Sequence, residues 1–148
     1  MGSTSDVTVM QACVDALEFF GVSPEVHVMS AHRDPEKVTA FVTQAENHGF
    51  GVIIAGAGMA AHLPGVVAAQ TTLPVIGVPL DASSLSGIDA LYSIVQMPPG
   101  IPVATVAIGK PGARNAGILA VQILALHDDG LKQKLQQFRK AGSKFPKK

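Results

Sequence analysis

Three short runs of small and β-branched apolar residues constrain the fold more than any other feature of this sequence. They occupy residues 52–55 (VIIA), 75–78 (VIGV) and 103–108 (VATVAI), with helical patterns between them. A strand in the middle of a parallel sheet is covered on both faces, so its residues are apolar without alternation. Because helices separate these runs, the sequence predicts a chain of βαβ units.

Helical patterns fill the remaining intervals, with Gly, Pro, Ser or Asp at the expected ends. The predicted helices span 8–20, 35–48 (with Asp34 as N-cap), a short stretch entered through Pro64, 88–96, 113–126 and 131–140, and a further short strand covers 26–29. Together they predict an α/β three-layer sandwich with a parallel, flavodoxin-like sheet and a C-terminal tail helix, in one domain of residues 1–148. Residues 144–148 are predicted to be a loose tail.

The segment Gly2–Asp6 leads into the first helix as the loop after a first strand would, yet only Met1 precedes it. In a flavodoxin-like order, that first strand lies between the strands predicted at 26–29 and 52–55. Its absence would leave buried peptide groups in the middle of the sheet without partners. We therefore expect the working protein to have an upstream strand.

Composition excludes several classes of partner. Eleven basic and eleven acidic residues cancel, so no global field attracts nucleic acid or an anionic membrane. Only 15% of residues are charged, which is low for a monomer and favours self-association. Cys13 is the single cysteine and no H-E-x-x-H motif occurs, so neither a disulfide nor a metal site is predicted. No secretory signal or stretch of ~20 apolar residues is present, and we expect a cytoplasmic protein.

The turn Ser30-Ala31-His32-Arg33 lies between a predicted strand and a predicted helix. Free N–H groups and the dipole at a helix start favour an anion, and a guanidinium adds a bidentate contact. Ser30 and Arg33 are therefore candidate phosphate ligands. The alternative is that Ser30 only ends the strand and that Arg33 pairs with a neighbouring carboxylate in solvent.

Two further loops follow strands that this topology makes neighbours. Gly2–Asp6 offers hydroxyl and amide groups for a phosphate and a carboxylate for sugar hydroxyls, although its Ser and Asp could simply cap a helix. Gly56–His62 is a run of small residues that would let a ligand approach the backbone closely. The alternative for this loop is close packing of helix on sheet, with His62 hydrogen-bonded to its own loop.

Among five histidines, His32 is the one that a strand end, a helix start and an arginine together predict to lie in the crevice. A histidine can give and take a proton near neutral pH, and a positioned one contributes roughly 10²–10⁴-fold in rate. We predict that His32 is a general acid and base.

Four segments together strongly resemble the bacterial-type 5-(carboxyamino)imidazole ribonucleotide mutases of purine synthesis. They are 1–6 (MGSTSD), 30–33 (SAHR), 55–65 (AGAGMAAHLPG) and 93–98 (SIVQMP), and the resemblance extends over nearly the whole chain. It implies a cofactor-free rearrangement that moves a carboxylate from the exocyclic nitrogen to ring carbon 4, through decarboxylation, trapped carbon dioxide and recarboxylation. It also implies a homo-octamer of flavodoxin-like subunits that acts on a small ribonucleotide.

The resemblance also implies roles for individual residues. His32 is similar to the family's proton shuttle between the exocyclic nitrogen and carbon 4. The implied substrate-binding residues are Ser3, Ser30 and Arg33 at the phosphate, Asp6 at the ribose, and Ala57, Gly58, Ala60, His62 and Leu63 around the ring and carboxylate.

The chain departs from the family pattern at Val7, Met59 and Pro99, where the family commonly has Trp, Gly and a basic or small residue. The animal-type relatives, which carboxylate the aminoimidazole directly, have Lys where this chain has Arg33. Direct carboxylation remains the alternative activity. A nucleotide-phosphate binding module with no need of His32, and a packing subunit without a ligand, are alternatives of other classes.

Overall fold

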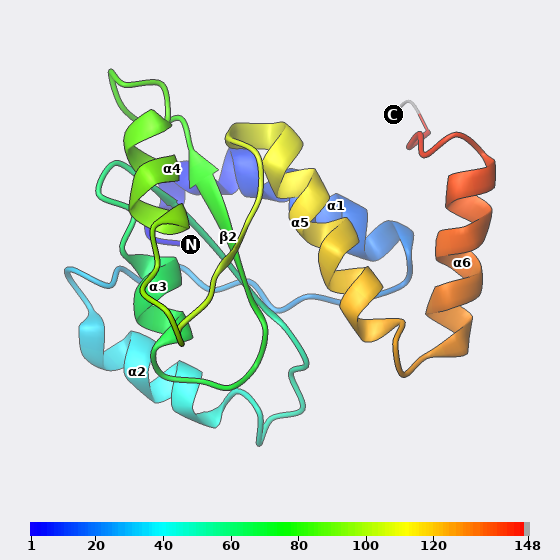
Figure 1. Ribbon diagram of the computed structural model, residues 1–148, viewed down its shortest axis with the longest axis horizontal. Coiled ribbons are helices and arrows are strands. Elements are labelled where there is room, and N and C mark those ends of the chain that lie inside the picture. The colour runs from blue at the N-terminus through cyan, green and yellow to red at the C-terminus, as the bar shows by residue number, and fades with distance from the viewer. Residues whose placement is uncertain (147–148) are drawn as a thin grey trace.

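The computed structural model describes residues 1–146 and has a parallel sheet between two layers of helices (Figure 1). Its three strands are β1 (Ile53–Gly58), β2 (Val75–Leu80) and β3 (Ala104–Thr105), in the order β1-β2-β3. Ile53 lies opposite Val75, and the register runs in parallel to the ends of both strands. All six residues of β2 are buried, as expected for a strand covered on both faces. The predicted parallel α/β architecture is confirmed.

Residues 1–146 contain six α-helices, and all but the last of them form the two outer layers. They are α1 (Val7–Phe19), α2 (Pro35–Gln44), α3 (Leu63–Ala68), α4 (Ile88–Val95), α5 (Gly109–Leu124) and α6 (Asp129–Lys140), and a 3-10 turn at Thr4–Asp6 precedes α1. Helices α1 and α5 cover one face of the sheet, and α2, α3 and α4 cover the other (Figure 1). A separate apolar core fills each interface, one around Phe20 and Val121 and the other around Val38 and Ile94.

The glycine-rich segment predicted to turn from residue 56 instead continues β1 as far as Gly58. A Cβ on Gly56 would lie 2.6 Å from the sulfur of Met10, so glycine here permits α1 to pack closely on the strand. The predicted strand at 103–108 is shorter than expected, although the Val106 N–H still donates to the Gly77 carbonyl at 3.1 Å. The longer β1 and the shorter β3 both depend on packing between distant parts of the chain, which the local sequence does not encode.

The prediction of a strand at 26–29 is wrong for this structure. Residues 22–30 carry no regular secondary structure, and within residues 1–146 β1 has a ladder partner on one edge only. A strand needs a neighbour to accept its peptide hydrogen bonds, and here an apolar cavity separates the segment from β1.

The predicted loose tail is partly wrong as well. The Phe145 ring lies 5.0 Å from those of Phe19 and Phe138, and the Arg114 guanidinium lies 5.2 Å from its centroid. Residues 147–148 lie outside the part of the chain that the structure describes. Among residues 1–146, no helix has the length and apolar character that crossing a bilayer requires.

Candidate active site

Three loops meet at the carboxyl ends of the strands, where ligands bind in open parallel sheets. The loop 59–62 follows β1, and the turn 30–34 leads into α2. The third is the N-terminal loop, Gly2–Asp6, which we call the first loop. Two hydrogen bonds of 2.9 Å join the residue before it, Met1, to the segment before the turn 30–34. The Met1 ammonium donates to the His27 carbonyl, and the Met29 N–H donates to the Met1 carbonyl. The structure therefore brings together the loops that the sequence singled out.

The first loop is organised as a capping box. The Asp6 carboxylate accepts the Ser3 N–H at 3.0 Å, and the Ser3 hydroxyl accepts the Ser5 N–H at 3.3 Å. Asp6 is only 7% exposed, so its side chain is held at the base of the loop while Ser3 is half-buried above it. Asp6 thus fixes the loop's shape whatever else it binds.

The turn 30–34 is fixed by Ser30, which is buried. Its hydroxyl accepts the Arg33 N–H at 3.2 Å, and its carbonyl accepts the Asp34 N–H at 2.8 Å. Asp34 occupies the predicted N-cap of α2, but its side chain makes no capping bond and instead lies 3.8 Å from Lys37. Arg33 is exposed and, among residues 1–146, forms no ion pair. Its guanidinium is therefore available to an anion at the helix start.

His32 and His62 are in direct contact. Nε2 of His32 lies 2.6 Å from Nδ1 of His62, and the two rings meet edge to face with centroids 4.8 Å apart. One ring must donate an N–H and the other must accept it, so the contact fixes the orientation of both imidazoles. The His62 side chain is therefore bonded across two loops, while its backbone N–H donates to the Ala60 carbonyl of its own loop at 2.7 Å.

The segment 57–63, which runs from the end of β1 to the first residue of α3, combines buried and open positions. Ala57 and Leu63 are buried, Gly58 is half-buried, and Ala60 is exposed beside the His pair. A Cβ on Gly58 would lie 2.7 Å from Cβ of Ala82, which explains the need for glycine there.

Met59 adopts a left-handed φ of 55°, and its side chain is 60% exposed. A left-handed backbone favours glycine, which gives a physical reason for the glycine expected at this position. More than half of the Met59 surface is therefore open to solvent.

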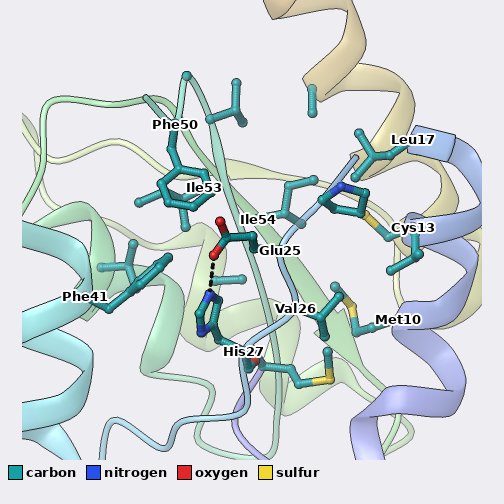
Figure 2. Close-up of a pocket in the computed structure, with 18 of the residues that line it drawn as sticks. Met10, Cys13, Leu17, Glu25, Val26, His27, Phe41, Phe50, Ile53 and Ile54 are labelled. Atoms are coloured by element: carbon teal, nitrogen blue, oxygen red, sulfur yellow. Dashed lines mark hydrogen bonds and ion pairs between the residues drawn. The ribbon is translucent and has the colours of Figure 1, made fainter. Parts of the chain in front are cut away.

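An apolar cavity lies outside the three loops that the sequence singled out. A cavity of about 300 Å³ lies below the loops, between β1 and residues 22–29, and neither His32 nor Arg33 lines it (Figure 2). A pair that the sequence also missed, Glu25 and His27 at 3.3 Å, lies beside this cavity. The charge alternation of residues 25–27 was the only available signal for that pair.

Comparison with known proteins agrees with this arrangement. The family model described as AIR carboxylase matches residues 1–144. The N5-carboxyaminoimidazole ribonucleotide mutase of Escherichia coli K12 is 57% identical over 95% of this chain and 83% of its own length. The mutase of Haemophilus influenzae is 58% identical over 94% of this chain and 85% of its own.

A crystal structure of Treponema denticola PurE superposes with a TM-score of 0.84 at 27% identity, covering 97% of this chain and 88% of the other. The predicted resemblance is therefore confirmed over most of the chain. The chain belongs to the AIR carboxylase family of enzymes.

Proposed function

We propose that this chain is a 5-(carboxyamino)imidazole ribonucleotide mutase of purine biosynthesis. The observation that carries the proposal is the hydrogen bond of 2.6 Å between His32 and His62, which orients an imidazole between the anion-binding turn and the small-residue loop. Two N5-carboxyaminoimidazole ribonucleotide mutases are 57% and 58% identical to the chain, which supports the same substrate class.

In this proposal the phosphate of the ribonucleotide binds at the start of α2. Arg33 provides a guanidinium with no competing ion pair among residues 1–146, and the buried Ser30 hydroxyl holds the turn in shape. Ser3 contributes from the neighbouring loop, and the Asp6 carboxylate faces the ribose hydroxyls. The helix dipole and free N–H groups of α2 add to the anion affinity.

His32 moves the proton that the rearrangement requires. As the bond between the exocyclic nitrogen and the carboxylate breaks, its electron pair remains on nitrogen, which takes a proton from His32, and carbon dioxide is released. Ring carbon 4 then attacks carbon dioxide and loses its own hydrogen as a proton to the same imidazole. The proton balance closes, so the reaction needs no external acid or base, and we propose that it needs no cofactor.

The segment 57–63 would hold carbon dioxide during this step. Ala57, Gly58 and Ala60 present little bulk, and neither they nor Leu63 carry an acidic or basic group, so the two fragments could stay in contact beside them. Recombination of two held fragments is effectively unimolecular, which is the advantage of trapping over release. His62 borders this space and orients His32.

We also propose that residues 1–148 form one domain that works as a homo-octamer in the cytoplasm. Four apolar side chains in and beside α4 are 46–64% exposed, which supports self-association: Leu85, Ile88, Tyr92 and Val95. Size-exclusion chromatography with light scattering measures the mass of the assembly, and that mass divided by the subunit mass gives the number of subunits.

Turnover of two alternative substrates tests the activity. The purified chain should convert the carbamate ribonucleotide without added bicarbonate, and His32→Asn should lower that rate by about 10²–10⁴-fold. Turnover only of aminoimidazole ribonucleotide plus bicarbonate would identify a direct carboxylase instead. Undiminished rescue of a purine auxotroph by His32→Asn would favour a binding module.

A further inference from the structure

The loop after β1 holds one residue in a backbone conformation that its residue type disfavours. Met59 has a φ of 55°, and the left-handed region is costly for any residue that carries a Cβ. Glycine adopts this region freely, so a glycine at this position would form the same turn without the strain. Strained residues persist where the surrounding structure imposes the strain, and they are concentrated at functional sites. The fold alone therefore gives no reason for a methionine here.

The neighbours of Met59 fix its backbone. On one side, a Cβ on Gly58 would lie 2.7 Å from Cβ of Ala82, so this glycine is packed against the chain that leaves β2. On the other side, the Met59 carbonyl accepts the Ala61 N–H at 2.9 Å, which closes a three-residue turn. The Cα of Met59 is thus held in place, while the three rotatable bonds of its side chain allow the thioether to move.

The place of Met59 in the chain puts it beside the proposed catalytic pair. It precedes His62 by three residues, and Nδ1 of His62 lies 2.6 Å from Nε2 of His32. Within residues 57–62, only Met59 and His62 have side chains larger than that of alanine. Met59 is 60% exposed, and His32 and Ala60 are exposed as well. The site residues are therefore open to solvent, whereas holding carbon dioxide requires a space that excludes water.

We propose that the Met59 side chain closes over the ring of the bound ribonucleotide and covers the space that holds carbon dioxide. This inference rests on the proposed mutase reaction. Methionine suits such a cover, because it is flexible and apolar and its thioether makes favourable contacts with aromatic rings. The cover carries no acidic or basic group, so proton transfer remains with His32. Its effect is to retain carbon dioxide between the two chemical steps.

Replacement of Met59 by glycine removes the cover and keeps the turn. The carbamate ribonucleotide, labelled with carbon-13 in its carboxylate, is converted in buffer that contains unlabelled bicarbonate. Mass spectrometry of the product after the first turnovers gives the ratio of lost to retained label, and samples without enzyme correct for spontaneous decarboxylation. Met59→Leu keeps an apolar side chain of similar size. Leu126→Ala is the matched control, since Leu126 is 76% exposed and lies beyond the end of α5, outside the candidate site.

We expect Met59→Gly to raise the ratio of lost to retained label at least about fourfold, which is the factor that corresponds to one buried methylene. Met59→Leu and Leu126→Ala should stay within about twofold of the parent chain. The Tm of Met59→Gly should equal that of the parent or exceed it by up to about 6 °C, because the backbone strain is relieved.

An unchanged label ratio in Met59→Gly, with normal turnover by the parent, would overturn the cover and leave the mutase reaction standing. An equal increase in Leu126→Ala would also refute it. A Tm of Met59→Gly more than about 3 °C below that of the parent would show that Met59 is a structural contact instead. Absence of turnover by the parent, or loss of all label by it, would reject the proposed reaction together with the cover.

Discussion

Replacing His62 by leucine should slow turnover by weakening the orientation of His32. The two rings share one hydrogen bond of 2.6 Å, and a typical hydrogen bond contributes a net ~0.5–1.5 kcal/mol. Since 1.4 kcal/mol corresponds to a factor of ten, we expect kcat to fall about 2- to 12-fold. His62→Asn should retain most of the rate, because its amide occupies the place of the imidazole Nδ1. His48→Leu, at an exposed histidine near the end of α2, is the matched control.

A double-mutant cycle on turnover of the carbamate ribonucleotide distinguishes positioning from an independent role. If His62 acts through His32, then His62→Leu should cause no further loss in the His32→Asn background. The pH profile of kcat should also change in His62→Leu and not in His48→Leu. Fully additive losses, or equal losses in His62→Leu and His62→Asn, would refute the reasoning.

Three other predictions concern stability and binding. Gly77→Ala should destabilise the fold by ~1–3 kcal/mol, because the new Cβ would lie 2.5 Å from the Ile94 side chain, and urea titration should show partial compensation when Ile94→Ala is added. Burial raises the pKa of the Cys13 thiol from 9.0 to about 12, so the stability that the neutral thiol contributes is full below pH 9 and falls between 9 and 12. Cys13→Ala should lose less stability than the parent chain between pH 8 and 10.5, and an equal loss would contradict this. Arg33→Lys should raise KM at least about 10-fold while leaving Tm within 1–2 °C, because an ammonium cannot make the bidentate phosphate contact.

The apolar pattern located most elements because it records which sides of the chain are buried. The predictions for β1 and β2 start within one residue of the observed strands, and α2 begins at Pro35 as expected. The pattern failed at 26–29 for a physical reason. Whether an apolar segment becomes a strand depends on a hydrogen-bond partner that is remote in sequence.

The candidate site was predictable as a set of loops but not as a set of contacts. The start of α2 at Pro35 was predicted correctly and located Ser30, His32 and Arg33 before that helix, although the strand expected at 26–29 did not form. The role of Asp6 in holding its own loop was an open alternative, and the 3.0 Å bond to Ser3 confirms that alternative. Nothing local indicated that His62 would turn toward His32, because thirty residues separate them.

The sequence by itself determined the layer order, the direction of the strands and the loops that form the site, because residue spacing alone encodes burial and turn geometry. The tertiary structure decided the His32–His62 contact, the close packing of Met10 on Gly56 of β1, and the apolar cavity between β1 and residues 22–29. Each of these depends on distances between residues far apart in the chain. Such distances follow from how complete helices and strands pack, and no local pattern carries them.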